Sequence, residues 1–166
     1  MLVRAFGGQG GASVRRGGGM RLGVRYGQMT IEDEACLSFD AASVVGVYWY
    51  TPHSNAFGCE IGIDYAKPQA EDGSLESNLV SGHADLLFPV GKPGAPARLY
   101  LLAGVDALVE LVTDATTVYT NYARALNVGG GLGVNGGRFD VRVCYSMPTD
   151  SENAQTLATV SVGVGF

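Results

Sequence analysis

Apolar residues alternate with small or polar residues along most of the chain, and the alternation is strictest over residues 156–166, T-L-A-T-V-S-V-G-V-G-F. One face of this segment carries Ala158, Val160, Val162, Val164 and Phe166. A period of two indicates a β-strand with one apolar face and one small or polar face. A soluble strand averages roughly five or six residues, whereas a tilted membrane-spanning strand needs about 9–11. The length of the segment therefore favours a strand that crosses a membrane.

Seven further segments show the same alternation and are predicted to be strands. They span residues 20–29, 43–50, 57–65, 81–90, 98–107, 122–134 and 138–146. Short connections, such as the hairpin signal Asn135-Gly136-Gly137, alternate with longer polar ones. Glu32 and Asp33 are assigned to one polar loop and residues 66–80 to another, while residues 108–119 are either loop or an extension of a hairpin above the barrel. An even number of strands, about eight, with turns on one side and loops on the other is typical of a transmembrane barrel.

The N-terminal segment does not fit this pattern. Residues 1–19 contain many glycines and three arginines but no apolar stretch of the kind that a signal peptide needs. We expect a flexible tail over residues 1–19 and a single barrel domain over residues 20–166. The route by which the chain would be exported stays open at this point.

Three stretches carry a family resemblance: A-R-L-Y-L-L-A-G-V-D (97–106), L-N-V-G-G-G-L-G-V-N-G-G-R-F-D-V-R-V-C-Y (126–145) and V-S-V-G-V-G-F (160–166). Together with the strand layout, they make residues 20–166 resemble the OmpA/OmpX-like bacterial outer-membrane protein β-barrel domains. The resemblance implies an all-β, eight-stranded antiparallel up-and-down transmembrane β-barrel in the bacterial outer membrane. It also implies that Phe166 is the C-terminal signal read by the barrel-assembly machinery.

Charged residues within the predicted strands share the face opposite the aliphatic residues. The acids of this face are Glu60, Asp64, Asp85, Asp106 and Asp140, and the bases are Arg21, Arg25, Arg98, Arg138 and Arg142. The interior of a narrow barrel is filled by side chains, and it tolerates charges when they are paired. We predict that these ten residues form a structural charge network in the lumen. A soluble barrel would reverse the two faces, so the pattern favours the membrane.

Large aromatic side chains lie near both ends of the apolar face. The predicted membrane-interface aromatics are Trp49, Phe57, Phe88, Phe139 and Phe166 near the short turns, and Tyr26, Tyr65 and Tyr145 near the long loops. Two aromatic bands that flank an aliphatic middle match the two interfaces of a bilayer. Glycine, at 25 of 166 residues, is frequent on the inward face, where small residues leave room for Arg, Tyr and Leu.

Candidate chemistry is sparse. Cys36, Cys59 and Cys144 have no metal-ligand spacing, and the chain has only two histidines, so we expect no metal site and no cofactor. Ser81, His83 and Asp85 share a strand face and are conceivable as a catalytic set. A histidine at the barrel rim beside a lumenal aspartate is the preferred interpretation, and we expect no enzyme activity. The net charge of −5 disfavours nucleic-acid binding.

The resemblance implies a non-enzymatic role, either structural or in adhesion and surface interaction, with at most a narrow gated ion path through the filled lumen. Expected partners are outer-membrane lipids and lipopolysaccharide, the assembly machinery, and a surface partner of the acidic loops; a monomer is expected. The alternative is a soluble or periplasmic β-barrel that binds a small apolar ligand. In that case Val160, Val162 and Val164 would face a dry interior.

Overall fold

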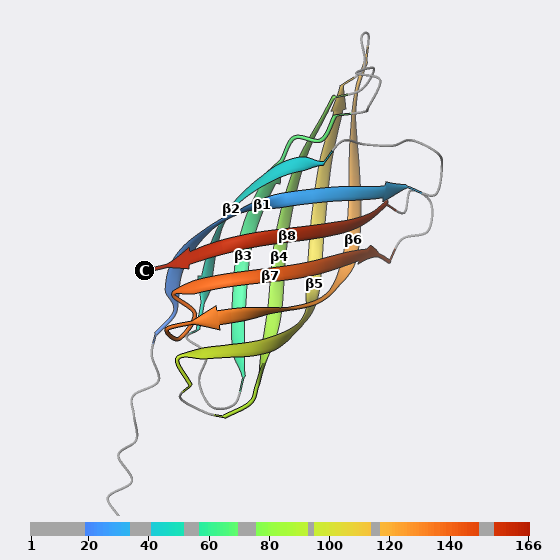
Figure 1. Ribbon diagram of the computed structural model, residues 1–166. Coiled ribbons are helices and arrows are strands. Elements are labelled where there is room, and N and C mark those ends of the chain that lie inside the picture. The colour runs from blue at the N-terminus through green and yellow to red at the C-terminus, as the bar shows by residue number, and fades with distance from the viewer. Residues whose placement is uncertain are drawn as a thin grey trace, which may run out of the picture.

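The described part of the protein forms eight strands, which close into a single antiparallel barrel (Figure 1). The computed structural model describes residues 19–33, 41–51, 57–69, 76–92, 95–113, 117–149 and 155–166. The strands are β1 (Arg21–Asp33), β2 (Ala42–Tyr50), β3 (Gly58–Ala66), β4 (Glu76–Val90), β5 (Ala97–Thr113), β6 (Val118–Val134), β7 (Phe139–Pro148) and β8 (Gln155–Gly165). The predicted eight-stranded up-and-down barrel is therefore confirmed.

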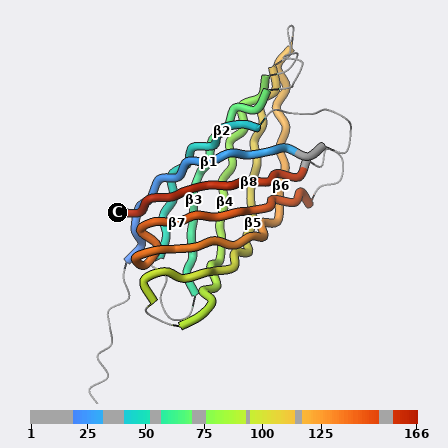
Figure 2. Tube along the Cα trace, in the orientation of Figure 1, coloured from blue at the N-terminus to red at the C-terminus, as the bar shows by residue number. Residues whose placement is uncertain are grey.

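Each strand pairs with its neighbours in the sequence, and the first and last strands close the barrel. Val24 of β1 lies opposite Val164 of β8, and the Phe166 backbone N–H donates to the Leu22 carbonyl at 2.8 Å. The strands are tilted relative to the long axis, as the Cα trace shows (Figure 2). None of the described residues forms a helix that is long and apolar enough to cross a membrane.

The barrel exposes its apolar face and buries its charged face. Aliphatic side chains such as Val24, Ile63 and Val162 are exposed, whereas Arg25, Glu60 and Asp85 are buried. A soluble barrel would do the reverse, since water favours charge outside and apolar side chains inside. The alternative of a soluble barrel with Val160 and Val162 in a dry interior is therefore wrong.

The lumen has three layers, and the middle one holds most of the buried charged side chains. An apolar layer lies toward the long loops and contains Met29, Ile31, Ala42, Val44, Ala66, Leu79, Leu108, Ala125 and Leu157. A layer of large side chains lies toward the short turns and contains Tyr48, Tyr50, Leu87, Tyr100 and Leu102. The cavity between the charged and apolar layers is only about 50 Å³, room for a few water molecules. No space for a small apolar ligand is left there.

Glycines make the tyrosine layer possible. A Cβ placed on Gly163 would lie 2.5 Å from Tyr48 Oη, and one on Gly131 would lie 2.5 Å from Tyr100 Oη. These distances are well inside van der Waals contact, so only glycine leaves room for the Tyr48 ring beside β8 and for the Tyr100 ring over the adjacent strand β6.

Several strand ends differ from the predicted ones, and all of the large differences lie at the long-loop end. β4 begins at Glu76 rather than residue 81, and β5 and β6 reach Thr113 and Val118. Residues 108–119 thus extend the hairpin, and the loop predicted over 66–80 is shorter. Glu32 and Asp33 belong to β1, where they pair with β8. Beyond the bilayer neither strand face must be apolar, so alternation fades there and no longer marks the strand.

Some predictions concern residues outside the described ranges. Residues 1–18 of the predicted tail, and most of the predicted acidic loops, fall there. So do His53 and Cys36, whereas Cys59 and Cys144 are free thiols.

Candidate functional site

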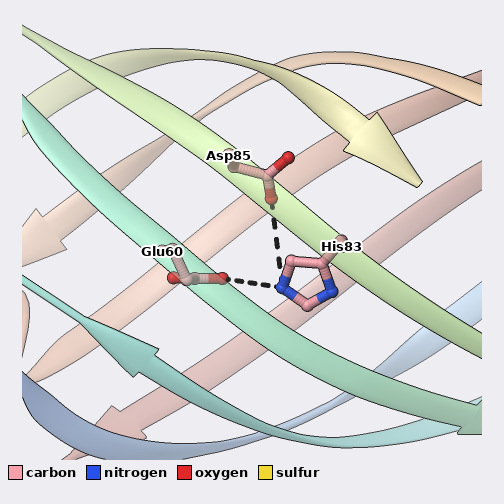
Figure 3. Close-up of side chains that lie close together, drawn as sticks. All are labelled: Glu60, His83 and Asp85. Atoms are coloured by element: carbon pink, nitrogen blue, oxygen red, sulfur yellow. Dashed lines mark hydrogen bonds and ion pairs between the residues drawn. The ribbon is translucent and has the colours of Figure 1, made fainter. Parts of the chain in front are cut away.

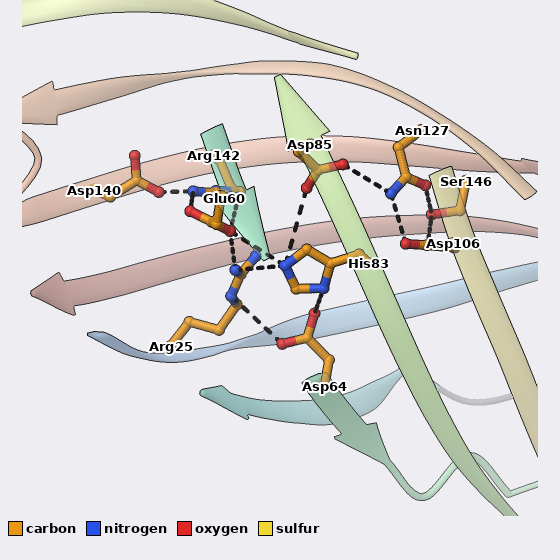
Figure 4. Close-up of polar contacts among 10 residues, drawn as sticks. All are labelled: Arg25, Glu60, Asp64, His83, Asp85, Asp106, Asn127, Asp140, Arg142 and Ser146. Atoms are coloured by element: carbon orange, nitrogen blue, oxygen red, sulfur yellow. Dashed lines mark hydrogen bonds and ion pairs between the residues drawn. The ribbon is translucent and has the colours of Figure 1, made fainter. Parts of the chain in front are cut away.

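The middle of the lumen is organised around Glu60, whose side chain is 1% exposed. Arg142 of β7 donates two hydrogen bonds to it, from Nη1 to Oε1 and from Nη2 to Oε2, each at 2.8 Å. Arg25 of β1 donates to the same Oε1 from the other side. Strand alternation turns all three side chains inward from three different strands. The Glu60 carboxylate is thereby held by two buried guanidiniums (Figure 4).

His83 lies beside this pair, enclosed by carboxylates from two strands. Its Nε2 is 3.3 Å from Glu60 Oε1 and 4.0 Å from Asp85 Oδ2 (Figure 3). Its Nδ1 is 3.4 Å from Asp64 Oδ2 (Figure 4). Arg25 Nη2, a donor, lies 3.1 Å from Nε2. The tautomer with its proton on Nδ1 satisfies both sides of the ring, because Nδ1–H then faces Asp64 and Nε2 accepts from Arg25. His83 thus lies in the charged layer, not at the barrel rim as predicted.

A second polar cluster continues the layer toward β5 and β6. Asn127 Nδ2 donates to Asp106 Oδ1 at 2.6 Å and to Asp85 Oδ1 at 3.1 Å. Ser146 Oγ lies 2.9 Å from Asp106 Oδ2 and 2.7 Å from Asn127 Oδ1. The amide therefore bridges two buried carboxylates that would otherwise repel one another. Asn127 and Ser146 were not among the predicted network residues, although both lie on the inward face of their strands.

Tyrosines join the layer at the short-turn side. Tyr100 Oη donates to Asp140 Oδ2 at 2.5 Å, and Asp140 Oδ1 accepts from Arg142 Nε at 2.9 Å. The Arg25 guanidinium lies 4.5 Å from the centre of the Tyr48 ring, a cation–π contact. Tyr48 and Tyr100 were also missing from the predicted network, which contained charged residues only.

The structure brings most of the predicted network residues together, but not all. Arg25, Glu60, Asp64, Asp85, Asp106, Asp140 and Arg142 lie within the connected layer of Figure 4. Arg98 is buried closer to the short turns, and Arg21, the first residue of β1, is partly exposed. Arg138 is exposed in the turn over residues 135–138, so its place in the predicted lumen network is corrected.

The reason for the Arg138 difference is local. β7 begins at Phe139, and Asn135, Gly136 and Gly137 take positive φ angles in the preceding turn. Alternation between faces does not extend into a turn, so the position of residue 138 relative to the β7 residues does not predict which way its side chain points. Instead of a balance of five acids and five bases, the predicted set contributes five inward carboxylates and three buried guanidiniums, those of Arg25, Arg98 and Arg142.

Glu60, His83 and Asp85 also offer three possible metal-ligand atoms within 4.8 Å of one another (Figure 3). Both oxygens of Glu60 already accept from guanidiniums, however, and a metal ion there would face the positive charges of Arg25 and Arg142. The geometry therefore fits a charge network better than a metal centre.

The conceivable catalytic set does not assemble. No hydrogen bond joins Ser81 to His83, and the imidazole is 5% exposed between carboxylates and Arg25. A nucleophile needs a base within hydrogen-bond reach and access to substrate. Neither condition is met at His83.

The outer surface completes the site description. All eight predicted interface aromatics are exposed on the outside of the barrel: Tyr26, Trp49, Phe57, Tyr65, Phe88, Phe139, Tyr145 and Phe166. Tyr26 and Tyr65 both lie opposite Val45, and Phe139 lies opposite Val164 near the other end. An apolar exterior over a filled, charged interior defines the class of small transmembrane β-barrels.

Solved structures of this class share the fold. Neisserial surface protein A (NspA) matches with a TM-score of 0.69 and 13% identity, over 90% of this chain and 97% of that one. Ail, the attachment invasion locus protein of Yersinia pestis, matches with a TM-score of 0.57 and 14% identity, over 89% and 97%. The N-terminal β-barrel domain of Pseudomonas aeruginosa OprF matches at 0.54 and 16%, over 87% and 97%.

These likenesses establish the fold of the chain as that of the small OmpA/OmpX-type outer-membrane barrels. No protein-family model and no curated protein sequence matches the chain.

Proposed function

We propose that the protein is a bacterial outer-membrane barrel with a closed lumen that acts at the cell surface through a protruding sheet. The protruding sheet comprises residues 76–80 of β4, 109–113 of β5 and 118–122 of β6. It extends past the ends of the neighbouring strands at the long-loop end (Figure 1). Such barrels direct their long loops to the cell exterior, so the sheet would face the surroundings of the cell.

The observation that carries this proposal is the exposed edge of the sheet. β3 ends at Ala66 opposite Leu79, and the described pairing of β7 with β6 begins at Ala125. Among the described residues, no strand therefore covers the outer edge of residues 118–123. Leu111, Val118, Tyr119 and Tyr122 expose large side chains on this sheet, and Tyr122 is 76% exposed. Exposed aromatic side chains of this kind favour contact with a partner rather than with water.

The structural neighbours support a surface role in general terms. Ail is named an attachment invasion protein and has been solved with the heparin analogue sucrose octasulfate. A sulfated polysaccharide fits the present chain poorly, since the connections over 34–41, 67–75, 114–117 and 149–154 contain seven acids and one base, Lys67. A partner with an apolar or basic surface suits the acidic, tyrosine-bearing end better.

The remaining parts of the proposal follow the same reasoning. We infer a monomer without cofactor or enzyme activity, inserted by the barrel-assembly machinery through the C-terminal strand that ends at Phe166. Its partners in the membrane would be outer-membrane lipids and lipopolysaccharide, contacted by the exposed apolar belt and its aromatics.

Adherence measurements test the surface role. A bacterial host without adhesins of its own should bind epithelial cell layers better when it displays the protein. The double variant Tyr119→Ser/Tyr122→Ser should lose at least about tenfold of this gain, because exposed aromatics dominate binding energies. The control Thr113→Ala/Thr120→Ala alters the same sheet without removing a ring. Wild type that adheres no better than the empty host would overturn the surface role.

Single-channel recording tests the closed lumen. We expect no steady current from the wild type in planar bilayers, because the charged layer lies between an apolar layer and a tyrosine layer. Arg25→Ala should admit brief currents at most, since the apolar layer at Met29 and Leu157 still closes the path. A steady current of one fixed size from the wild type would contradict the filled lumen.

A further inference from the structure

The outer wall of the barrel is hollowed across β3, β4, β5 and β6. The hollow has a volume of about 630 Å³, and its lining includes Ile61, Ile63, Gly82, Ala84, Ala107 and Leu126. Small residues form its middle: a Cβ placed on Gly82 would meet no atom within 4 Å. Larger apolar side chains from β3 and β6 flank it. The surface thus offers a groove on the face that meets lipid.

Arg124 lies at one end of this groove and also lines it. It is exposed, and it is the one Lys or Arg side chain on the outward face of the strands as far as they are described. No hydrogen bond or ion pair joins its guanidinium to another described residue. A lone cation on an otherwise apolar wall is unfavourable within the bilayer core, so its depth matters.

The strand register gives the depth of Arg124. Starting from Tyr26, pairing through β2 to β5 leads to Tyr122 on β6, whereas pairing through β8 and β7 leads to Leu132. This offset of ten residues, 132 minus 122, is the shear that accompanies strand tilt.

The shear shows which residues are level with one another. The shear of ten residues is divided over eight strands, so it amounts to about four residues between β3 and β6. The β6 residue that is level with a given β3 residue therefore lies about four residues closer to the short turns than the β6 residue reached by following the pairing. Leu126 is then level with Tyr65, and Arg124 lies just beyond it on the long-loop side. The guanidinium therefore stands at headgroup depth, with the apolar groove below it.

We propose that this groove binds one acyl chain of a phosphorylated glycolipid of the outer leaflet, whose phosphate is bound by Arg124. The proposal rests on the membrane placement in the proposed function. A lipid fits because the exposed wall of the groove is apolar and opens toward the bilayer. An anionic headgroup fits because Arg124 is the one exposed charged side chain among the residues that line the groove. A phosphate monoester presents three acceptor oxygens and about −1.5 to −2 charges, which suits a guanidinium fork better than a phospholipid diester does.

Native mass spectrometry of the detergent-refolded full chain tests the phosphate contact. The probes are bisphosphorylated lipid A, the same lipid after dephosphorylation, and phosphatidylglycerol. Wild type should retain one bisphosphorylated lipid A, and Arg124→Gln should weaken this binding about tenfold, since hydrogen bonds to charged groups are the stronger ones. Arg138→Gln, which removes an exposed arginine at the opposite end, should change nothing. Equal binding by Arg124→Gln, or of phosphatidylglycerol, would overturn the assignment.

A second variant tests the groove independently of the charge. Gly82→Leu should fill part of the hollow, since its Cβ would meet no atom within 4 Å, and should also weaken lipid A binding about tenfold. Ala103→Leu places the same side chain on the outer face of β5, outside the groove, and should bind as the wild type does. A faster band on unboiled gels verifies that each variant is folded. Unchanged binding by folded Gly82→Leu would overturn the proposal that the lipid lies in the groove. A loss of adherence without a change in lipid binding would concern only the proposed role of the protruding sheet.

Discussion

Glu60→Gln should destabilise the barrel by about 3–5 kcal/mol, because it removes one partner of a buried ion pair and leaves the other charged. The neutral amide would still fill the space, so the loss measures charge and not volume. Arg142 loses its bidentate carboxylate, and Arg25 loses its closest anion. Urea titration in phospholipid vesicles, read by the band shift of unboiled samples, gives the change in unfolding free energy.

The matched control for Glu60→Gln is Glu76→Gln at the edge of the protruding sheet. Glu76 Oε2 lies 2.9 Å from Lys67 Nζ, and both side chains are about half exposed. The hydrogen bond and the charge of Glu76 raise the pKa of Lys67. Since water screens exposed pairs, Glu76→Gln should leave the urea midpoint unchanged. Equal shifts for the two variants would show that the Glu60 pair is as hydrated as a surface pair.

The barrel itself could be predicted from the sequence because a bilayer imposes one rule on every strand. Each outward residue within the bilayer core meets hydrocarbon, so the apolar positions of residues 158–166 repeat without exception. The same alternation turns Arg25, Glu60 and Asp85 inward. In a narrow barrel the outward face of each strand contacts lipid and the inward face forms salt bridges, so the two faces differ sharply in composition. A strict period of two is therefore sufficient to predict the number of strands, their order and which face of each strand points outward.

The lumenal details could not be predicted, because parity states which face a residue is on and not how deep it lies. Leu79 and Leu157 share the inward face with the charged residues, yet they pack into an apolar layer above them. His83 was placed at the rim, since the depth of β4 depends on a register that no local pattern reports. The β4 part of the protruding sheet was missed for a related reason: Ser77 and Asn78 continue β4 where no bilayer selects for apolar residues.

Val162→Arg should prevent or weaken insertion, at a cost of at most about 2–4 kcal/mol, the value for a cation at the bilayer midplane. Val162 is 53% exposed on the outer surface of β8. Along β8 it lies between Ala158, which pairs with Tyr145, and Val164, which pairs with Phe139, and Tyr26 of β1 lies opposite it. The folded fraction after dilution from urea into vesicles measures the effect, and Thr120→Arg on the protruding sheet is the control that should fold normally.

The environment in which Val162→Arg fails distinguishes the membrane barrel from any soluble one. In the present structure the new guanidinium would meet lipid, so the loss should shrink in short-chain detergent micelles, where the charge can reach water. In a soluble barrel Val162 would face the core, and the same change would unfold the chain in every solvent. Rescue of folding by short-chain detergent micelles is therefore expected only if the apolar face of β8 is the outer one. Failure to fold in every solvent would reverse that assignment.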